Sequence, residues 1–269
     1  MILIRLRKQN FRKRYGPWGL IAGGSSGLGA EYARQLARRG LNLVLVARRL
    51  APLEALAAQL SSEYGVQVRP LQFDLQQSEL LGDLAMQIKD LEIGLLVYNA
   101  AYSAVGPFFN QPLETHLREL RVNSQTPLAL VHMLGKPMLD RGRGGMILMS
   151  SLSAGQGTPL VANYAATKAY SQVFGEGLWD ELRSKGVDVL VCSPSVVTKP
   201  GQPLVERQGL SAPAVSTREV VSEALAGLGR QPGVIPGRSS RLAAFFMRHL
   251  MPRRWAIQMM GRAMRSLYS

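Results

Sequence analysis

Short aliphatic runs alternate with longer segments of helical periodicity along most of the chain. The runs lie at residues 18–23, 42–48, 67–74, 93–100, 144–151 and 187–194. They are apolar at successive positions, as strands covered by helices on both faces must be. Amphipathic segments that are long enough for crossover helices lie between them, near residues 28–39, 50–64, 77–90, 113–139 and 164–185. This order predicts a single α/β domain built on a doubly wound parallel sheet.

The regular alternation stops after Pro194. A Pro- and Gly-rich stretch covers about 194–214, and we interpret it either as a lid over a ligand crevice or as an ordinary surface connection. A short helix near 217–229 and a last strand at 232–237 would complete the domain. Two further helical segments follow at 241–251 and 253–268, separated by Pro252. We therefore expect a basic tail over 1–14, the domain over 15–237 and a helical tail over 238–269.

The net charge of +14 is concentrated at the two ends of the 269-residue chain. Residues 1–14 contain six Lys and Arg, residues 238–269 contain seven Arg, and neither stretch contains Asp or Glu. Because the residues between them carry a net charge of only +1, nucleic acid is not an expected partner. Arginines interleaved with Trp and Phe in 241–268 suit the surface of an anionic membrane. The alternative is that these helices contact a subunit or the core.

The sequence contains no pattern that predicts a disulfide, a metal site or a membrane-spanning segment. Cys192 is the single cysteine, and the three histidines, His116, His132 and His249, have no ligand spacing. No window reaches about 18 uncharged apolar residues, and the first residues lack the apolar run of a signal peptide. We expect no metal and a cytoplasmic protein, with peripheral contact at the inner face of a membrane as a further hypothesis.

The first strand runs directly into a glycine-rich turn, "AGGSSGLG" at residues 22–29, which opens a helix. Backbone amides of such a turn and the helix N-terminus hold the pyrophosphate of a dinucleotide. The predicted cofactor residues of this turn are Gly23, Ser25, Ser26, Gly27, Leu28 and Gly29. A tight turn without a ligand is the alternative.

The second strand ends at Ala47, where an NAD site places a carboxylate for the ribose hydroxyls. This chain has Arg48 and Arg49 there, and a guanidinium pairs with the 2′-phosphate of NADP. The sequence therefore favours NADP(H), although two solvated arginines at the end of a strand are the alternative. Asp74, after the third strand, is placed to accept from the adenine amino group or to cap the next helix.

Tyr164 and Lys168 lie four residues apart in "NYAATKAY", so on a helix they share one face. Ser151, at the end of a strand, precedes Tyr164 by 13 residues. When a hydride reduces a carbonyl, the resulting alkoxide must be stabilised and protonated. We predict Tyr164 as proton donor, Lys168 as the ammonium that lowers the phenol pKa, and Ser151 as the donor that holds the carbonyl. A packed aromatic beside a surface cation is the alternative.

Together these motifs resemble the short-chain dehydrogenase/reductase superfamily over about residues 15–230. The matching segments are "AGGSSGLG", "YNAA" at 98–101, "YAATK" and "SPSVVT". The resemblance implies a Rossmann fold and a Ser–Tyr–Lys–Asn tetrad, in which Asn123 anchors a water to Lys168. It further implies cofactor contacts by Asn99, Tyr164, Lys168, Pro194, Val197 and Thr198, and a homodimer or homotetramer paired through the helices near 113–139 and 164–185.

The chain departs from the usual motifs at Ala22, Tyr98, Ala101 and Ser195, none of which handles a proton. Residues 15–75 are similar to the steroid and very-long-chain 3-ketoacyl reductase branch. The resemblance implies reversible, NADPH-dependent reduction of a ketone to a secondary alcohol on a hydrophobic substrate, such as a 3-ketoacyl chain, steroid or other lipid. A catalytically idle dinucleotide sensor or scaffold on the same fold is the alternative function.

Overall fold

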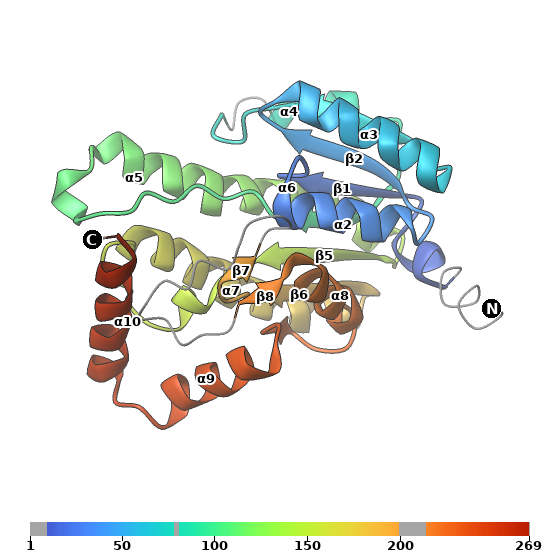
Figure 1. Ribbon diagram of the computed structural model, residues 1–269. Helices are drawn as coiled ribbons and strands as arrows, with labels where there is room; N and C mark the ends of the chain where they lie inside the picture. The colour runs from blue at the N-terminus through green and yellow to red at the C-terminus, as the bar shows by residue number, and fades with distance from the viewer. Residues whose placement is uncertain (1–9, 78–80, 199–213, 269) are drawn as a thin grey trace.

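A seven-stranded, all-parallel sheet forms the centre of the computed structural model, which describes residues 10–77, 81–198 and 214–268 (Figure 1). Its strands are β1 (Trp18–Ala22), β2 (Asn42–Ala47), β3 (Val68–Gln72), β4 (Ile93–Tyr98), β5 (Gly144–Met149), β6 (Val187–Cys192) and β9 (Gly233–Val234). The strand order is β3-β2-β1-β4-β5-β6-β9. The order reverses between β1 and β4, which opens a crevice at their carboxyl ends. The predicted doubly wound sheet is confirmed.

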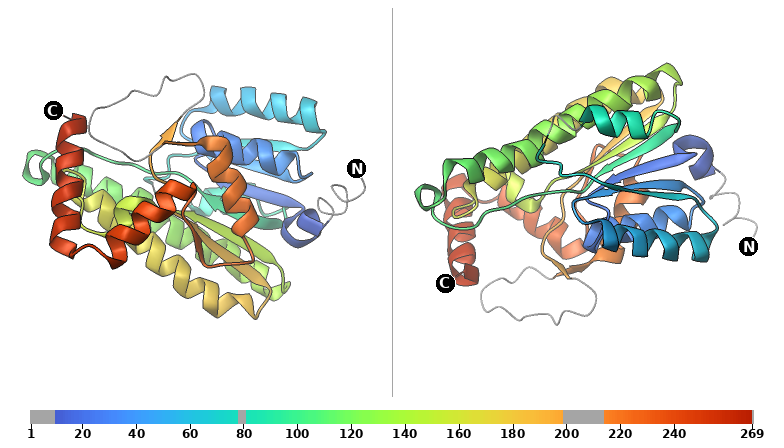
Figure 2. Two further views of the ribbon diagram at one scale, coloured as in Figure 1. Left: turned by 60° about the horizontal axis from the view of Figure 1, so that its bottom comes forward. Right: turned by 90° about the horizontal axis from the view of Figure 1, so that it is seen from above.

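Helices cover both faces of the sheet (Figure 2). One face carries α2 (Gly27–Ala37), α3 (Leu50–Tyr64) and α8 (Thr217–Gly227). The other carries α4 (Leu81–Gln87), α6 (Thr126–Asp140) and α7 (Ala162–Arg183). Within β2, Leu43 and Leu45 face the first group while Val44 and Val46 face the second. This is why the strands are apolar at successive positions in the sequence.

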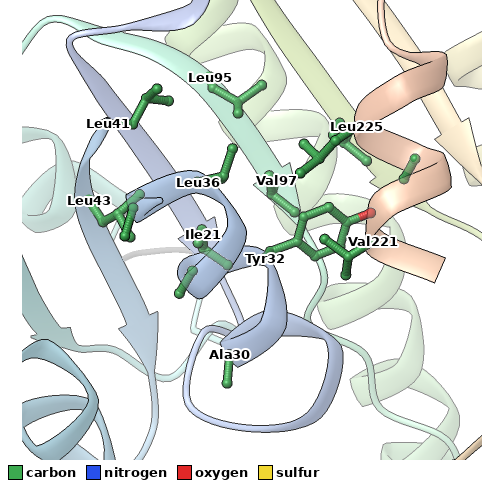
Figure 3. Packing of buried hydrophobic residues seen from close by; sticks show 14 of the residues in the cluster. Ile21, Ala30, Tyr32, Leu36, Leu41, Leu43, Leu95, Val97, Val221 and Leu225 are labelled. Atoms are coloured by element: carbon green, nitrogen blue, oxygen red, sulfur yellow. The ribbon is translucent and has the colours of Figure 1, made fainter. Parts of the chain in front are cut away.

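Tyr32 of α2 shows how the first layer packs (Figure 3). Its ring is fully buried and lies among Val97 of β4 and Val221 and Leu225 of α8. A single aromatic residue therefore joins α2, the sheet and a helix almost 200 residues later in the chain.

The helix expected near 113–139 is interrupted. It consists of α5 (Leu113–Leu120), a π-helical turn η3 (Arg121–Gln125) and α6. The buried hydroxyl of Tyr98, at the end of β4, donates a hydrogen bond to the carbonyl of Val122 within that turn. A π turn inserts an extra residue into the helical ladder and is frequent at functional sites. Periodicity alone did not predict this interruption.

A two-stranded sheet of β7 (Val197–Thr198) and β8 (Val215–Ser216) was not predicted either. It joins the two ends of the Pro- and Gly-rich stretch. Residues 199–213 between them lie outside the described residues, so the lid interpretation stays a prediction.

The chain continues into α9 (Arg238–His249) and α10 (Arg253–Tyr268) (Figure 1). Helix α10 packs on the segment between Ser151 and Tyr164. A Cβ atom on Gly261 would lie 3.0 Å from the Pro159 side chain, and Ile257 lies against Gly157. Over the residues that the structure describes, no helix is both long enough and apolar enough to cross a membrane.

Residues 10–15 form a short helix at the opposite end of the molecule from α10. Asp188, on β6 and only 5% exposed, anchors it. The Asp188 carboxylate accepts from Arg14 Nε at 2.6 Å, from Arg14 Nη2 at 2.8 Å and from the Tyr15 hydroxyl at 2.6 Å. The end of the basic N-terminal segment thus contacts the domain, while the predicted boundaries at residues 14 and 237 stay predictions.

We expect Asp188→Ala to destabilise the fold by about 2–4 kcal/mol, because it leaves the Tyr15 hydroxyl buried without a partner and removes the ion pair with Arg14. Urea unfolding of the full chain measures this difference. The control is Asp90→Ala, which removes the exposed pair with Arg69 and should change the unfolding midpoint little. Equal midpoints for the two variants would contradict the anchoring role of Asp188.

Candidate active site

The carboxyl ends of the central strands border a crevice of about 340 Å³. It is lined by seven of the residues predicted to bind the cofactor: Gly23, Ser25, Ser26, Arg48, Arg49, Asp74 and Asn99. They follow β1, β2, β3 and β4, so residues up to 76 positions apart in the sequence share one site. The crevice lies at the point where the strand order reverses, which is the usual ligand position in such sheets.

Two glycines of the turn after β1 have no room for a side chain. A Cβ on Gly29 would lie 1.9 Å from the Gly23 carbonyl oxygen, and a Cβ on Gly23 would lie 2.7 Å from the Ala100 nitrogen. Gly23 also has a φ of +82°. The Asn99 side chain donates to the Gly23 carbonyl at 3.0 Å and so ties the turn to β4. The turn thereby brings bare backbone and the start of α2 to the crevice, as pyrophosphate binding requires.

Arg48 and Arg49 line the crevice with exposed side chains. Neither has an acidic partner within the described part of the chain, so both guanidinium groups are available to a phosphate. Asp74 also lines the crevice, but its carboxylate accepts from the backbone and side-chain amides of Gln76. Its geometry is that of a turn-capping aspartate, and the predicted adenine contact stays a prediction.

Ser151 follows β5, and Tyr164 and Lys168 lie one turn apart near the start of α7. Lys168 is only 3% exposed, and its Nζ donates to the Met149 carbonyl at 2.9 Å. The same Nζ lies 5.5 Å from the centre of the Tyr164 ring. Ser151 lies close enough to the Tyr164 hydroxyl to lower its pKa. The structure therefore brings together the three residues that the sequence selected.

The surroundings of Tyr164 and Lys168 shift the pKa values of both side chains. Burial raises the pKa of Tyr164, the nearby Ser151 side chain lowers it and the negative charge of Glu119 raises it. The predicted lowering of the Tyr164 pKa by Lys168 stays a prediction. Burial lowers the pKa of Lys168 itself to about 8. Tyr164 therefore holds its proton at neutral pH, as a donor in ketone reduction must.

This lysine predicts a pH dependence. Because its pKa is lowered to about 8, Lys168 is charged below that pH and loses its proton above it. We expect kcat/KM for ketone reduction to fall as pH rises through about 8, since the neutral amine cannot stabilise an alkoxide. Steady-state rates between pH 6 and 10 measure the profile. In Lys168→Arg, which stays charged, the residual activity should not decline over this range; a flat profile in the unmodified enzyme would contradict the assignment.

Asn123 lies in the π turn η3 and is 1% exposed. Its side chain accepts from the Tyr102 amide at 2.9 Å and donates to the Tyr102 carbonyl at 2.8 Å and to Thr167 Oγ1 at 3.1 Å. It thus fixes the segment after β4 to α7, beside Lys168. Its predicted water contact stays a prediction.

Sequence reasoning missed Glu119, which is 1% exposed on α5. Its carboxylate accepts from the Ala104 amide at 2.7 Å and from Asn163 Nδ2 at 2.6 Å. It therefore joins the segment after β4 to the residue next to Tyr164. The available signal was its position four residues before Asn123, on the same helix face.

At the nicotinamide end of the predicted site, Pro194 follows β6 and accepts from the Leu152 amide at 3.1 Å. Val197 and Thr198 form β7. Their predicted cofactor contacts stay predictions. In the described ranges, no three His, Cys, Asp or Glu side chains gather as metal ligands would.

Comparison with known proteins adds a family match. Residues 18–207 match the family model described as short chain dehydrogenase. The chain is 33% identical over 239 residues to a 7beta-hydroxysteroid dehydrogenase from Clostridium sardiniense, covering 86% of this chain and 90% of that protein. It is 33% identical over 233 residues to a very-long-chain 3-oxoacyl-CoA reductase from Lodderomyces elongisporus, covering 81% of this chain and 65% of that protein.

The fold is also similar to those of solved proteins. A structure described in a study of 7beta-hydroxysteroid dehydrogenase stereoselectivity matches with a TM-score of 0.87 at 27% identity, covering 93% of this chain and 98% of that chain. A short-chain dehydrogenase from Sphingobium yanoikuyae in complex with NADPH matches with a TM-score of 0.73 at 30% identity, covering 86% and 92%.

Proposed function

The chain belongs to the short-chain dehydrogenases, and from this premise we propose that it is an NADPH-dependent reductase that converts a ketone on a hydrophobic substrate reversibly into a secondary alcohol. One observation carries the proposal: Tyr164 and the buried Lys168 lie one turn apart on α7 with Lys168 Nζ 5.5 Å from the centre of the Tyr164 ring, and Ser151 lies near the Tyr164 hydroxyl. Family membership by itself supports oxidoreduction between a ketone and an alcohol with a nicotinamide cofactor. Direction, cofactor preference and substrate class are the proposed additions.

Each residue of the group has a separate task. The cofactor, when bound, supplies the hydride. Ser151 donates a hydrogen bond to the carbonyl oxygen and orients it toward Tyr164. Tyr164 transfers its proton to that oxygen as negative charge develops, and the charged Lys168 stabilises the phenolate that remains. Because Lys168 is buried, little water screens this charge.

The preference for NADPH rests on charge at the end of β2. Arg48 and Arg49 offer two guanidinium groups where an NAD site has a carboxylate, and neither is neutralised by an acidic side chain in the described ranges. A similar short-chain dehydrogenase has been solved with NADPH. Both observations support 2′-phosphate recognition.

The proposed substrate is apolar, such as a 3-ketoacyl chain, a steroid or another lipid. Two relatives support this class: one is named as a hydroxysteroid dehydrogenase and the other as a very-long-chain 3-oxoacyl-CoA reductase. The test is NADPH oxidation, followed at 340 nm, across ketones of graded chain length and ring number. Turnover limited to apolar ketones supports the proposal, and turnover of small polar ketones alone contradicts the substrate class. NADPH binding without any turnover would favour the idle sensor or scaffold.

The proposed assembly is a homodimer or homotetramer. Large apolar side chains are exposed along the helices that the resemblance implies as the interface: Leu113, Leu117 and Leu120 on α5, Leu128 on α6, and Tyr170 and Val173 on α7. Their burial against a second copy would remove this surface from water. Light scattering of the purified chain measures the mass of the assembly.

The C-terminal helices carry a second exposed apolar face. Four large apolar side chains there are about half exposed or more: Leu242, Phe245 and Phe246 on α9 and Trp255 on α10. The sequence from 238 to 269 contains seven arginines and no acidic residue. Ser240 is buried on the side of α9 opposite Leu242 and Phe246, so these two side chains point away from the domain, whereas Phe245 lines a cavity between α9, α7 and α8. The proposed occupant is an anionic membrane surface, as the composition of the tail indicates.

We expect the double variant Leu242→Ser, Phe246→Ser to lose sedimentation with anionic phosphatidylglycerol liposomes, because it removes the apolar part of this face. Met86→Ser, at an exposed methionine on α4, is the matched control and should sediment normally. If the unmodified chain fails to sediment, or if the double variant sediments equally well, the membrane proposal is wrong. A change in its mass by light scattering would instead place a second subunit on this face.

A further inference from the structure

Arg118 lies in the nucleotide crevice, although no sequence motif selected it. It is carried by α5 and lines the same cavity as Ser25, Arg48 and Arg49. The two earlier arginines follow β2, whereas Arg118 lies beside Ala101 and Tyr102, which follow β4. Because β2 and β4 flank β1 on opposite sides, the crevice has cationic side chains on both of its walls.

The ring of Tyr102 supports the Arg118 side chain. Its guanidinium carbon lies 5.3 Å from the centre of the Tyr102 ring, which is a cation–π distance. The backbone of Tyr102 is itself fixed at both its amide and its carbonyl by the side chain of Asn123. Arg118 is therefore supported by a rigid stack and loses less side-chain freedom on binding a ligand than a free surface arginine does.

The hydrogen-bonding capacity of Arg118 is not used up by the protein. Its Nε atom is buried and has no hydrogen-bond partner. The charge of Arg118 acts on Glu114, but the Glu114 carboxylate accepts its hydrogen bond from Arg121, at 2.6 Å. A buried guanidinium N–H without a partner is costly. An anionic ligand in the crevice would satisfy it.

We propose that Arg118 binds a phosphate group of the dinucleotide from the β4 side of the crevice, opposite Arg48 and Arg49. This inference rests on the proposed use of NADP(H). Arg118 could bind either of two phosphate groups: the pyrophosphate, which both nucleotides possess, or the 2′-phosphate, which only NADPH has. A guanidinium binds either through paired, charge-assisted hydrogen bonds.

The test is fluorescence titration of the full chain with NADPH and with NADH. Arg118→Gln should weaken NADPH binding by roughly tenfold or more, the usual loss for a charge-assisted hydrogen bond. Equal weakening of NADH binding identifies the pyrophosphate as the contact, and an unchanged NADH affinity identifies the 2′-phosphate. The variant should also reduce the dependence of NADPH affinity on salt concentration, because one ionic contact is lost.

Two controls make the result specific. Arg38→Gln removes an equal charge from the exposed end of α2 and should leave both affinities unchanged. Arg118→Lys keeps the charge but not the planar fork, so it should restore only part of the affinity. If Arg118→Gln folds normally and binds both nucleotides as tightly as the unmodified chain, the inference is wrong. If the unmodified chain binds neither nucleotide, the proposed function fails together with it.

Discussion

Replacing Tyr164 with phenylalanine is expected to lower kcat for ketone reduction by about 10²- to 10⁴-fold, the range for loss of a general acid. The change removes only the hydroxyl, which lies near Ser151 and carries the transferred proton in the proposed mechanism. The ring remains to pack beside Lys168. The affinity for NADPH should therefore stay within about twofold, because the crevice lining that holds the phosphates is untouched.

The control for this prediction is Tyr170→Phe, six residues later on α7. Tyr170 is partly exposed and stacks on Phe174, so removal of its hydroxyl should leave kcat unchanged. Single-turnover rates with bound NADPH separate chemistry from product release. Equal rates for Tyr164→Phe and the unmodified chain would end the proposed mechanism.

The second large effect is expected from Arg48→Ala. This variant should bind NADPH about 10- to 100-fold more weakly while its affinity for NADH stays nearly unchanged, because the lost guanidinium would contact only the 2′-phosphate. The physical basis is the absence of an acidic partner for Arg48 in the described part of the chain. The ratio of the two dissociation constants, measured by titration, gives the result directly.

Arg49→Ala, made in parallel, shows how the two adjacent guanidinium groups divide the contact. Arg183→Ala, on the exposed surface of α7 and paired with Asp180, serves as a control for the loss of one positive charge. An equal loss of affinity for NADH and NADPH in Arg48→Ala would refute 2′-phosphate recognition, although it would leave the tetrad assignment intact.

The strands and most of the helices were predictable because their signals are local. The double-sided burial of β2 is visible as an unbroken apolar run, and the predicted helix at 50–64 matches α3 residue for residue. The family resemblance is likewise confirmed, since the motifs that carry it are short and contiguous. Tyr164, Lys168 and Ser151 could be selected because the family spaces them within 18 residues.

The missed features depend on contacts across the fold. The π turn η3 is associated with Tyr98, which bonds Val122 from 24 residues away, and no helical periodicity encodes such a partner. In the sequence, Arg118 is indistinguishable from an ordinary surface arginine, and only the tertiary fold places it in the crevice. The burial that raises the pKa of Tyr164 is likewise a property of the packed state.

The close fit of Gly261 against Pro159 has a consequence for how this protein could diverge. Helix α10 packs on the segment that begins at Ser151, so a bulkier residue at Gly261 would displace that segment without altering Ser151, Tyr164 or Lys168. Substitutions more than 90 residues beyond Tyr164 in the sequence could therefore alter the range of substrates. Variation in selectivity among related reductases should then be sought at their C-terminal ends as well as around their catalytic side chains.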